Sequence, residues 1–150
     1  MRIQTDTWSC GPIAVLNALK ALGVRASEKR VRAHTATVRG QGTTHGGIIN
    51  AIERFGCEAR DLRFDDPEEG FKEIHAHVQL GAAVLLYVDG DHWTVVIGSL
   101  GDRLVLFDSE NRPENKAECG VWMCDLRNLK RRWKKDCDNA HYGIVVTRTD

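Results

Sequence analysis

The chain has 150 residues, which is the size of one globular domain built around one hydrophobic core. Hydrophobic residues make up 42% and charged residues 28%, a composition that excludes a disordered chain. Lys and Arg number 21 and Asp and Glu also 21, so no net charge favours nucleic acid or an anionic membrane. We therefore expect a single domain over residues 1–150, with no membrane partner and no general affinity for nucleic acid.

Cysteine content and the N-terminus indicate the compartment. The five cysteines are an odd number, which fits reduced thiols better than a disulfide framework. No apolar run is long enough to span a membrane, and the N-terminus turns polar without a signal-peptide core. These features predict a reducing, cytoplasmic protein. If Met1 is the natural start, the three residues before Gln4 leave no room for a propeptide.

Helical patterns dominate the first part of the chain. Apolar residues recur at helical spacing, and capping residues bracket them, which predicts helices over residues 10–22, 27–34 and 44–56. A weak strand follows over residues 58–64. The next helix covers residues 67–80, with Pro67 at its start and Gly81 just after its end.

Strand patterns dominate the rest. Three runs rich in β-branched and aliphatic residues cover 82–89, 93–100 and 103–108, and polar turns separate them, which predicts an antiparallel meander. A basic helix over residues 125–135 and a last strand over 141–149 complete the chain. Helices followed by strands indicate an α+β fold in which N-terminal helices pack on a C-terminal antiparallel sheet.

Cys10 stands where a nucleophile would be placed. It occupies the first turn of the best predicted helix, where unpaired backbone amides and the helix dipole favour a thiolate. Gln4 lies six positions upstream on an extended segment. Its side-chain amide and the Cys10 backbone N–H would together form an oxyanion hole.

His92 and Asp108 are the candidate base and its orienting carboxylate. His92 begins a buried strand after a polar turn, and Asp108 ends the neighbouring strand. A two-residue turn at Gly101 and Asp102 would put Asp108 on the wrong face. We therefore predict a three-residue loop over 100–102, with Gly101 at positive φ and Asp108 opposite Thr94, diagonal to His92. An Asp108 on the opposite face would promote Asn111 or Asp91 instead.

The segments from Gln4 to Pro12 and from Asp91 to Val96, with the strand that ends at Asp108, resemble the papain-like cysteine peptidases. The most similar branch comprises the double-glycine leader peptidases of bacteriocin exporters. The resemblance spans nearly the whole chain and implies a papain-like fold without a cofactor. It implies that Gln4 supports the oxyanion, Cys10 attacks, His92 is the base and Asp108 orients it. One departure is Ser109, where the family usually has Pro.

These residues predict a thiol hydrolase acting on a peptide or protein substrate. The same triad serves an amidase, a deamidase or an acyl transferase, which stays open as an alternative. A non-catalytic binding module that kept the papain-like fold is a further alternative. An apparently complete set of four site residues favours an enzyme over that module.

Two aromatic residues and one histidine lie near these motifs in the sequence. Trp8 and Trp93 are either core aromatics or walls of a substrate cleft beside Cys10 and His92. His45 lies in the Gly/Thr-rich loop over residues 40–47, and we expect it to be solvated. This loop has no Lys-Ser/Thr ending and is not a phosphate-binding loop.

Two further patterns lie in the C-terminal third. Four residues have a spacing that loosely matches a zinc site: Cys119, Cys124, Cys137 and His141. The favoured interpretation is that these thiols pack separately and bind no metal. Five charges fall in six residues, as a solvated helix face or a surface for an acidic partner: Lys130, Arg131, Arg132, Lys134 and Lys135.

Overall fold

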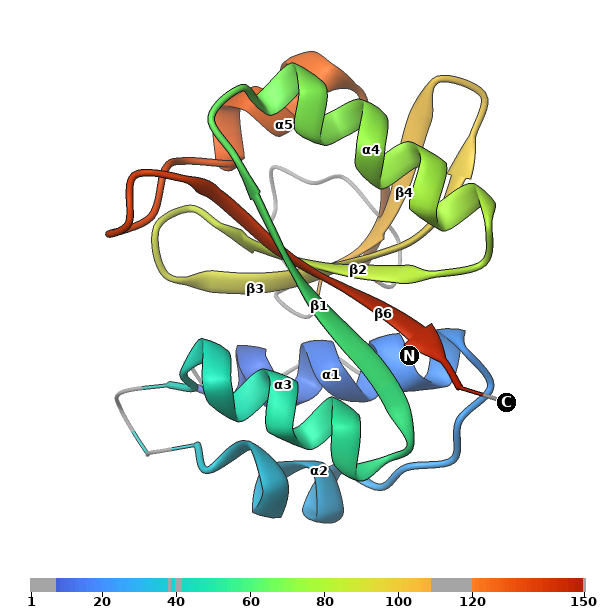
Figure 1. Ribbon diagram of the computed structural model, residues 1–150, viewed down its shortest axis with the longest axis vertical. Coiled ribbons are helices and arrows are strands. Elements are labelled where there is room, and N and C mark those ends of the chain that lie inside the picture. Colours follow the sequence, from blue (N-terminus) through green and yellow to red (C-terminus); the bar gives the residue numbers. More distant parts are fainter. Residues whose placement is uncertain (1–7, 38, 40–41, 109–119, 150) are drawn as a thin grey trace.

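Helices cover both faces of one antiparallel sheet (Figure 1). The computed structural model describes residues 8–37, 39, 42–108 and 120–149. On one face, α1 (Cys10–Ala21) and α3 (His45–Arg54) pack on the sheet, and α2 (Glu28–Thr35) packs on the outer side of these two helices. Two helices pack on the other face: α4 (Pro67–Gln79) and α5 (Leu126–Arg132). None of these described helices is long and apolar enough to cross a membrane.

The sheet has six described strands in the order β1-β6-β2-β3-β4-β5. Their bounds are β1 (Cys57–Phe64), β2 (Ala83–Val88), β3 (His92–Leu100), β4 (Arg103–Phe107), β5 (Val121–Cys124) and β6 (His141–Arg148). Every pair is antiparallel, and β6 inserts between β1 and β2. The predicted α+β class and the predicted meander through β2, β3 and β4 are confirmed.

Local side-chain caps explain why the predicted helices begin where they do. Ser27, Thr44 and Asp66 each accept a hydrogen bond from a backbone N–H in the first turn of α2, α3 and α4. Such caps satisfy amides that have no partner within the helix. The helix starts therefore agree with the predictions to within a residue.

Strand β5 was not predicted, and α5 is shorter than predicted. β5 has only four residues and is half-exposed along most of its length, so it lacks an alternating pattern. α5 ends at Arg132 because the chain turns inward at Trp133, which is fully buried. The predicted helix over 125–135 is therefore wrong beyond Arg132.

The loop between β3 and β4 corrects the predicted register. Leu100 pairs with Arg103 across a two-residue turn, so the predicted three-residue loop is wrong, although Gly101 does have a positive φ of 62°. A β-bulge at Ile97 shifts the register instead, since Val96 pairs with Leu106 while Gly98 pairs with Val105. The bulge shifts the pairing of β3 with β4 by one residue, which is the shift that the three-residue loop was expected to produce. Continued past Val95 and Phe107, this register sets Asp108 opposite Thr94.

One apolar cluster fills each side of the sheet. The cluster under α1, α2 and α3 includes Cys10 and Trp93, and the cluster under α4 and α5 includes Trp133. Gly70 in α4 is required for the second cluster. A Cβ atom at that position would lie 2.6 Å from the Trp133 ring and 2.9 Å from Phe64.

We expect Gly70→Ala to destabilise the chain by about 1–3 kcal/mol, because a packed core resists an added methyl group. Gly46→Ala is the matched control, since a Cβ there meets nothing within 4 Å in the first turn of α3. The control should be neutral or slightly stabilising, because Ala favours a helix over Gly. Urea unfolding measures both variants, and equal stabilities would contradict the packing assigned to Gly70.

Candidate active site

Cys10 is the first residue of α1, as predicted. Its side chain is buried at 6% exposure, and the Ser9 carbonyl accepts the first helical hydrogen bond from Ile13 at 3.0 Å. Cys10 belongs to the same apolar cluster as Trp93, the residue that follows His92 in β3. The start of α1 therefore packs on the face of the sheet to which Trp93 points.

The Gly/Thr-rich loop approaches the chain directly after Cys10. A Cβ atom at Gly11 would lie 2.6 Å from Thr43 Oγ1, so only glycine permits this approach. Hydroxyl contacts of 2.6 Å between Thr43 and Thr37 and 2.8 Å between Thr37 and Thr35 tie the loop to the end of α2. The loop thus borders the start of α1.

His92 and Asp108 form the predicted contact. His92 Nε2 donates to Asp108 Oδ1 at 2.6 Å, and both side chains are almost completely buried, at 2% and 0% exposure. Thr94 supports the end of β4, because its hydroxyl donates to the Phe107 carbonyl at 3.1 Å. The Asp108 N–H donates to the Gly120 carbonyl at 2.9 Å. The Ile97 bulge is the reason that Asp108 reaches His92 despite the two-residue turn.

Arg132 holds the second oxygen of Asp108. Its Nη2 donates to Asp108 Oδ2 at 2.8 Å and to Asp89 Oδ2 at 2.8 Å, while its Nε donates to Asp89 at 3.1 Å. Burial by itself would raise the pKa of the Asp108 carboxyl, but His92 and Arg132 outweigh it and hold that pKa below its ordinary value. Asp108 is therefore a buried carboxylate with a cationic partner on one oxygen and an imidazole on the other.

Comparisons with known proteins identify the family of the chain. The model of the Peptidase C39 family matches residues 1–121. The chain belongs to the Peptidase C39 family. This membership confirms the predicted resemblance to a peptidase family.

A curated relative of this C39 family member is the uncharacterized protein MTBMA_c00490 of Methanothermobacter marburgensis, which is 35% identical over 100 residues. The match covers 67% of the chain and 63% of that relative, so it spans less than two thirds of the relative's length.

Three solved structures share the fold over nearly the whole chain. The double-glycine motif protease of an AMS/PCAT transporter, solved with the leader peptide, has a TM-score of 0.75 at 17% identity, covering 98% of this chain and 89% of that one. The peptidase domain of Streptococcus ComA, a bifunctional ABC transporter, has a TM-score of 0.73 at 23% identity, covering 99% and 97%. The peptidase C39-like domain of a Vibrio parahaemolyticus toxin secretion ATP-binding protein has a TM-score of 0.65 at 12% identity, covering 96% and 100%. These likenesses confirm the papain-like fold.

Trp93 and the half-buried His45 belong to a cluster of aromatic rings. Trp93 is 1% exposed, so it is a core aromatic and not a wall of an open cleft. Its position on β3 turns it toward α1 and α3, away from the side occupied by α4 and α5. His45 stacks on Tyr142 with ring centroids 4.0 Å apart, and burial lowers its pKa against the attraction of Asp136. The expectation of a solvated His45 is therefore wrong, because the start of α3 packs against the sheet.

The remaining predicted site residues are Trp8 and Gln4. Trp8 is half-buried, and the Arg39 guanidinium lies over its ring at 5.2 Å from the centroid. Gln4 lies outside the described residues, so its predicted place beside Cys10 stays a prediction.

The described members of the zinc-like pattern have other environments. Cys119 lies outside the described residues. Burial raises the pKa of the Cys124 thiol to about 12, and Cys137 is exposed. His141 Nδ1 lies 2.8 Å from the Trp133 carbonyl and donates to it. Within the described part of the chain, no three His, Cys, Asp or Glu side chains are grouped to hold a metal.

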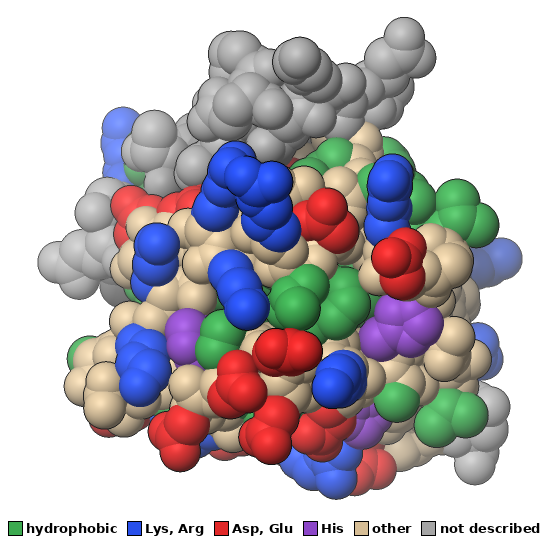
Figure 2. Space-filling model, turned by 90° about the horizontal axis from the view of Figure 1, so that it is seen from above, with side chains coloured by type: hydrophobic (Ala, Val, Ile, Leu, Met, Phe, Trp, Pro, Cys, Tyr) green, Lys and Arg blue, Asp and Glu red, His purple; other side chains and the backbone are tan. Residues whose placement is uncertain are grey.

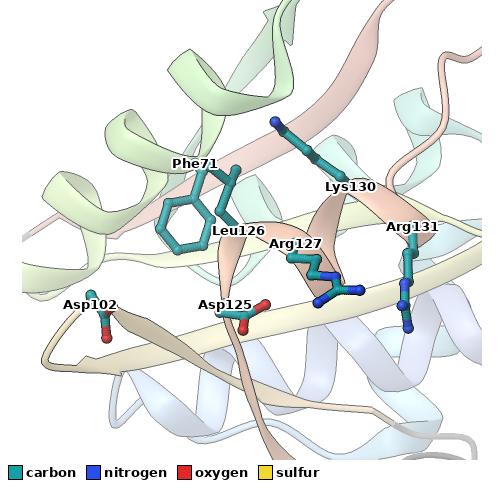
Figure 3. A pocket seen from close by; sticks show the side chains of 7 residues that line it. All are labelled: Phe71, Asp102, Asp125, Leu126, Arg127, Lys130 and Arg131. Carbon is teal, nitrogen blue, oxygen red and sulfur yellow. The ribbon is translucent and has the colours of Figure 1, made fainter.

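Four charges of the basic run are exposed, as expected for a solvated helix face, whereas Arg132 is half-buried. Arg132 turns inward to Asp108, whereas Lys130 and Arg131 line a groove of about 580 Å³ (Figure 3). Lys134 and Lys135 follow the end of α5 and line a separate hollow of about 220 Å³. Phe71, Leu126, Asp102 and Asp125 also line the first groove. The face above α4 and α5 accordingly shows acidic and basic side chains around a small apolar area (Figure 2).

The low pKa of Asp108 predicts part of the acid sensitivity of the fold. A depressed carboxyl pKa contributes stability above the unfolded pKa of about 3.9, and this contribution is lost as the pH falls through the lower folded-state pKa. Asp108→Asn removes the titrating group. Its free energy of unfolding should be lower than that of the wild type near neutral pH but should fall less steeply in the acid range. Urea unfolding at several pH values measures this, and parallel pH curves for the two proteins would contradict it.

Proposed function

We propose that this C39 family member cleaves peptide bonds with Cys10 as nucleophile, His92 as base, Asp108 as orienting carboxylate and Gln4 as oxyanion donor. We also propose that residues 1–150 act as one domain in a reducing, cytoplasmic compartment. The observation that carries the proposal is the buried contact of 2.6 Å between His92 Nε2 and Asp108 Oδ1. A carboxylate fixed on Nε2 selects the ring tautomer and stabilises the imidazolium.

In the proposed mechanism, His92 Nδ1 receives the proton of the Cys10 thiol because Asp108 engages Nε2. The thiolate attacks the amide carbonyl and forms a C–S bond, while the carbonyl electrons move to the oxygen. The Cys10 N–H and Gln4 stabilise this oxyanion. The tetrahedral intermediate expels the amine, which takes the proton from His92. Water activated by His92 then hydrolyses the thioester and regenerates the thiol.

A peptide is the proposed substrate class. The transporter protease with a similar fold was solved with a leader peptide, which supports peptide binding by this fold. The amidase, deamidase and acyl transferase alternatives use the same triad and differ in their products. Mass spectrometry of a peptide library, with and without an added amine, tests the proposal. Backbone hydrolysis supports it, whereas side-chain amide loss, or transfer to the amine, would replace it with an alternative.

Alkylation by iodoacetamide tests the nucleophile. Cys10 should react faster than free cysteine near neutral pH despite its burial, because a thiolate paired with an imidazolium is the reactive form. His92→Ala should remove this advantage. Cys137 is exposed and will also be labelled. Labelling of Cys10 is therefore followed by mass spectrometry of its peptide in a Cys137→Ser variant. The labelling rate of Cys137 in the unsubstituted chain serves as the reference for an exposed thiol. A Cys10 no more reactive than free cysteine would support the non-catalytic binding module.

Gln4→Ala tests the oxyanion donor. Loss of one such donor lowers kcat by about 100- to 1000-fold, since it acts on the transition state and little on substrate binding. The iodoacetamide reactivity of Cys10 should stay near that of the wild type, because alkylation forms no oxyanion. Steady-state kinetics on a peptide found in the library experiment measure kcat and KM. A change confined to KM would contradict the role of Gln4.

A further inference from the structure

Arg132 joins three segments that meet at the His92–Asp108 pair. It is the last residue of α5, and its guanidinium contacts Asp108 after β4 and Asp89 in the turn before β3. Its own carbonyl accepts a hydrogen bond of 2.8 Å from the Asp89 N–H. Asp89 has a positive φ of 56°, a conformation that Asp tolerates better than most residues. Side-chain and backbone contacts of Arg132 therefore both hold the turn that leads into His92.

The two oxygens of Asp108 have different partners. Oδ1 accepts from His92 Nε2 at 2.6 Å, and Oδ2 accepts from Arg132 Nη2 at 2.8 Å. A carboxylate with one hydrogen bond can rotate about χ2, whereas one held at both oxygens has a single orientation. The Asp108 side chain is fully buried and the Arg132 side chain is 15% exposed, so solvent screens this ion pair weakly.

The surroundings of Arg132 restrict it to this geometry. Its guanidinium carbon lies 4.9 Å from the centre of the Trp122 ring in β5, a cation–π distance. Trp133, the next residue, is buried, and its Nε1 donates to the Tyr142 carbonyl at 3.0 Å. Arg131, the preceding residue, is exposed and is one of the residues that line the groove of Figure 3. Only Arg132 of the basic run contacts the His92–Asp108 pair among the described residues.

We infer that Arg132 is a positioning residue, which acts through Asp108 to hold the His92 imidazole in the orientation that activates Cys10. This inference rests on the proposed triad. It assigns a role in the site to a residue that contacts neither the nucleophile nor the substrate in the proposed mechanism. The bridge to Asp89 couples the orientation of the carboxylate to the turn that sets the start of β3.

The pH dependence of Cys10 alkylation by iodoacetamide tests the inference. Loss of the guanidinium in Arg132→Gln lets the Asp108 carboxylate rotate away from His92, which weakens its hold on the imidazolium that pairs with the Cys10 thiolate. The inflection of the rate against pH should move up by about one unit, so that alkylation at a pH below the wild-type inflection is about tenfold slower. Arg131→Gln is the matched control and should leave the profile unchanged. A merely structural role would lower the melting temperature without moving the inflection of the folded protein.

A double-mutant cycle with Asp108→Asn shows whether Arg132 acts through Asp108. Substitution of Arg132 should slow alkylation in the wild-type background and add little in the Asp108→Asn background. Arg132→Lys is measured in the same cycle and replaces Arg132→Gln if the latter does not fold. It should also slow alkylation, because one ammonium group cannot reproduce the paired contacts of the guanidinium. Equal slowing in both backgrounds, or no slowing in either, overturns the inference.

The wild-type rate separates the two proposals. If wild-type Cys10 reacts no faster than free cysteine, the triad fails and the role of Arg132 fails with it. If wild-type Cys10 is activated and the Arg132 variants leave its inflection in place, the triad stands and only the positioning role is overturned.

Discussion

A carboxylate without contact with solvent is the constraint on which this site depends. Asp108 is fully buried, and a buried charge is tolerated only when hydrogen bonds and an opposite charge compensate for the lost hydration. His92 alone would satisfy one oxygen. Arg132 satisfies the other and, by its charge, keeps the carboxyl ionised. Because Arg132 is part of α5, its ion pair with Asp108 helps to fix the position of that short helix on the sheet, together with apolar packing.

One irregular residue in the sheet, Ile97, places Asp108 on the same face as His92. A regular ladder from the two-residue turn would have set Asp108 opposite Val95, on the face away from His92. The bulge at Ile97 reverses the face of every residue of β3 between the bulge and His92, relative to β4. The exposed turn can therefore be the short type with glycine at positive φ, while the correction is made inside the sheet. The geometry of the His92–Asp108 pair thus depends on an irregularity elsewhere in β3.

The sequence predicted these features unequally, for physical reasons. Helix starts at Ser27, Thr44 and Asp66 were predictable because capping is a local interaction. The contact of His92 with Asp108 was predicted correctly with the wrong cause, since pattern alone does not separate a longer loop from a bulge. Arg132 was missed because a basic helix end has the same sequence whether its side chains face water or a buried carboxylate. Its one signal was the adjacent Trp133, whose burial turns the end of the helix toward the sheet.

The site draws its members from both sides of the sheet. Cys10 starts α1 in the layer of α1, α2 and α3, whereas Arg132 ends α5 in the opposite layer (Figure 1). Each layer has its own apolar cluster, and β3 contributes Trp93 to one and Val96 to the other. The start of the helix that carries the thiol and the groups that orient its proposed base therefore depend on different apolar clusters. A chain with one side of the sheet unpacked would lack the complete site, so the reactivity of Cys10 should depend on the packing of the whole fold.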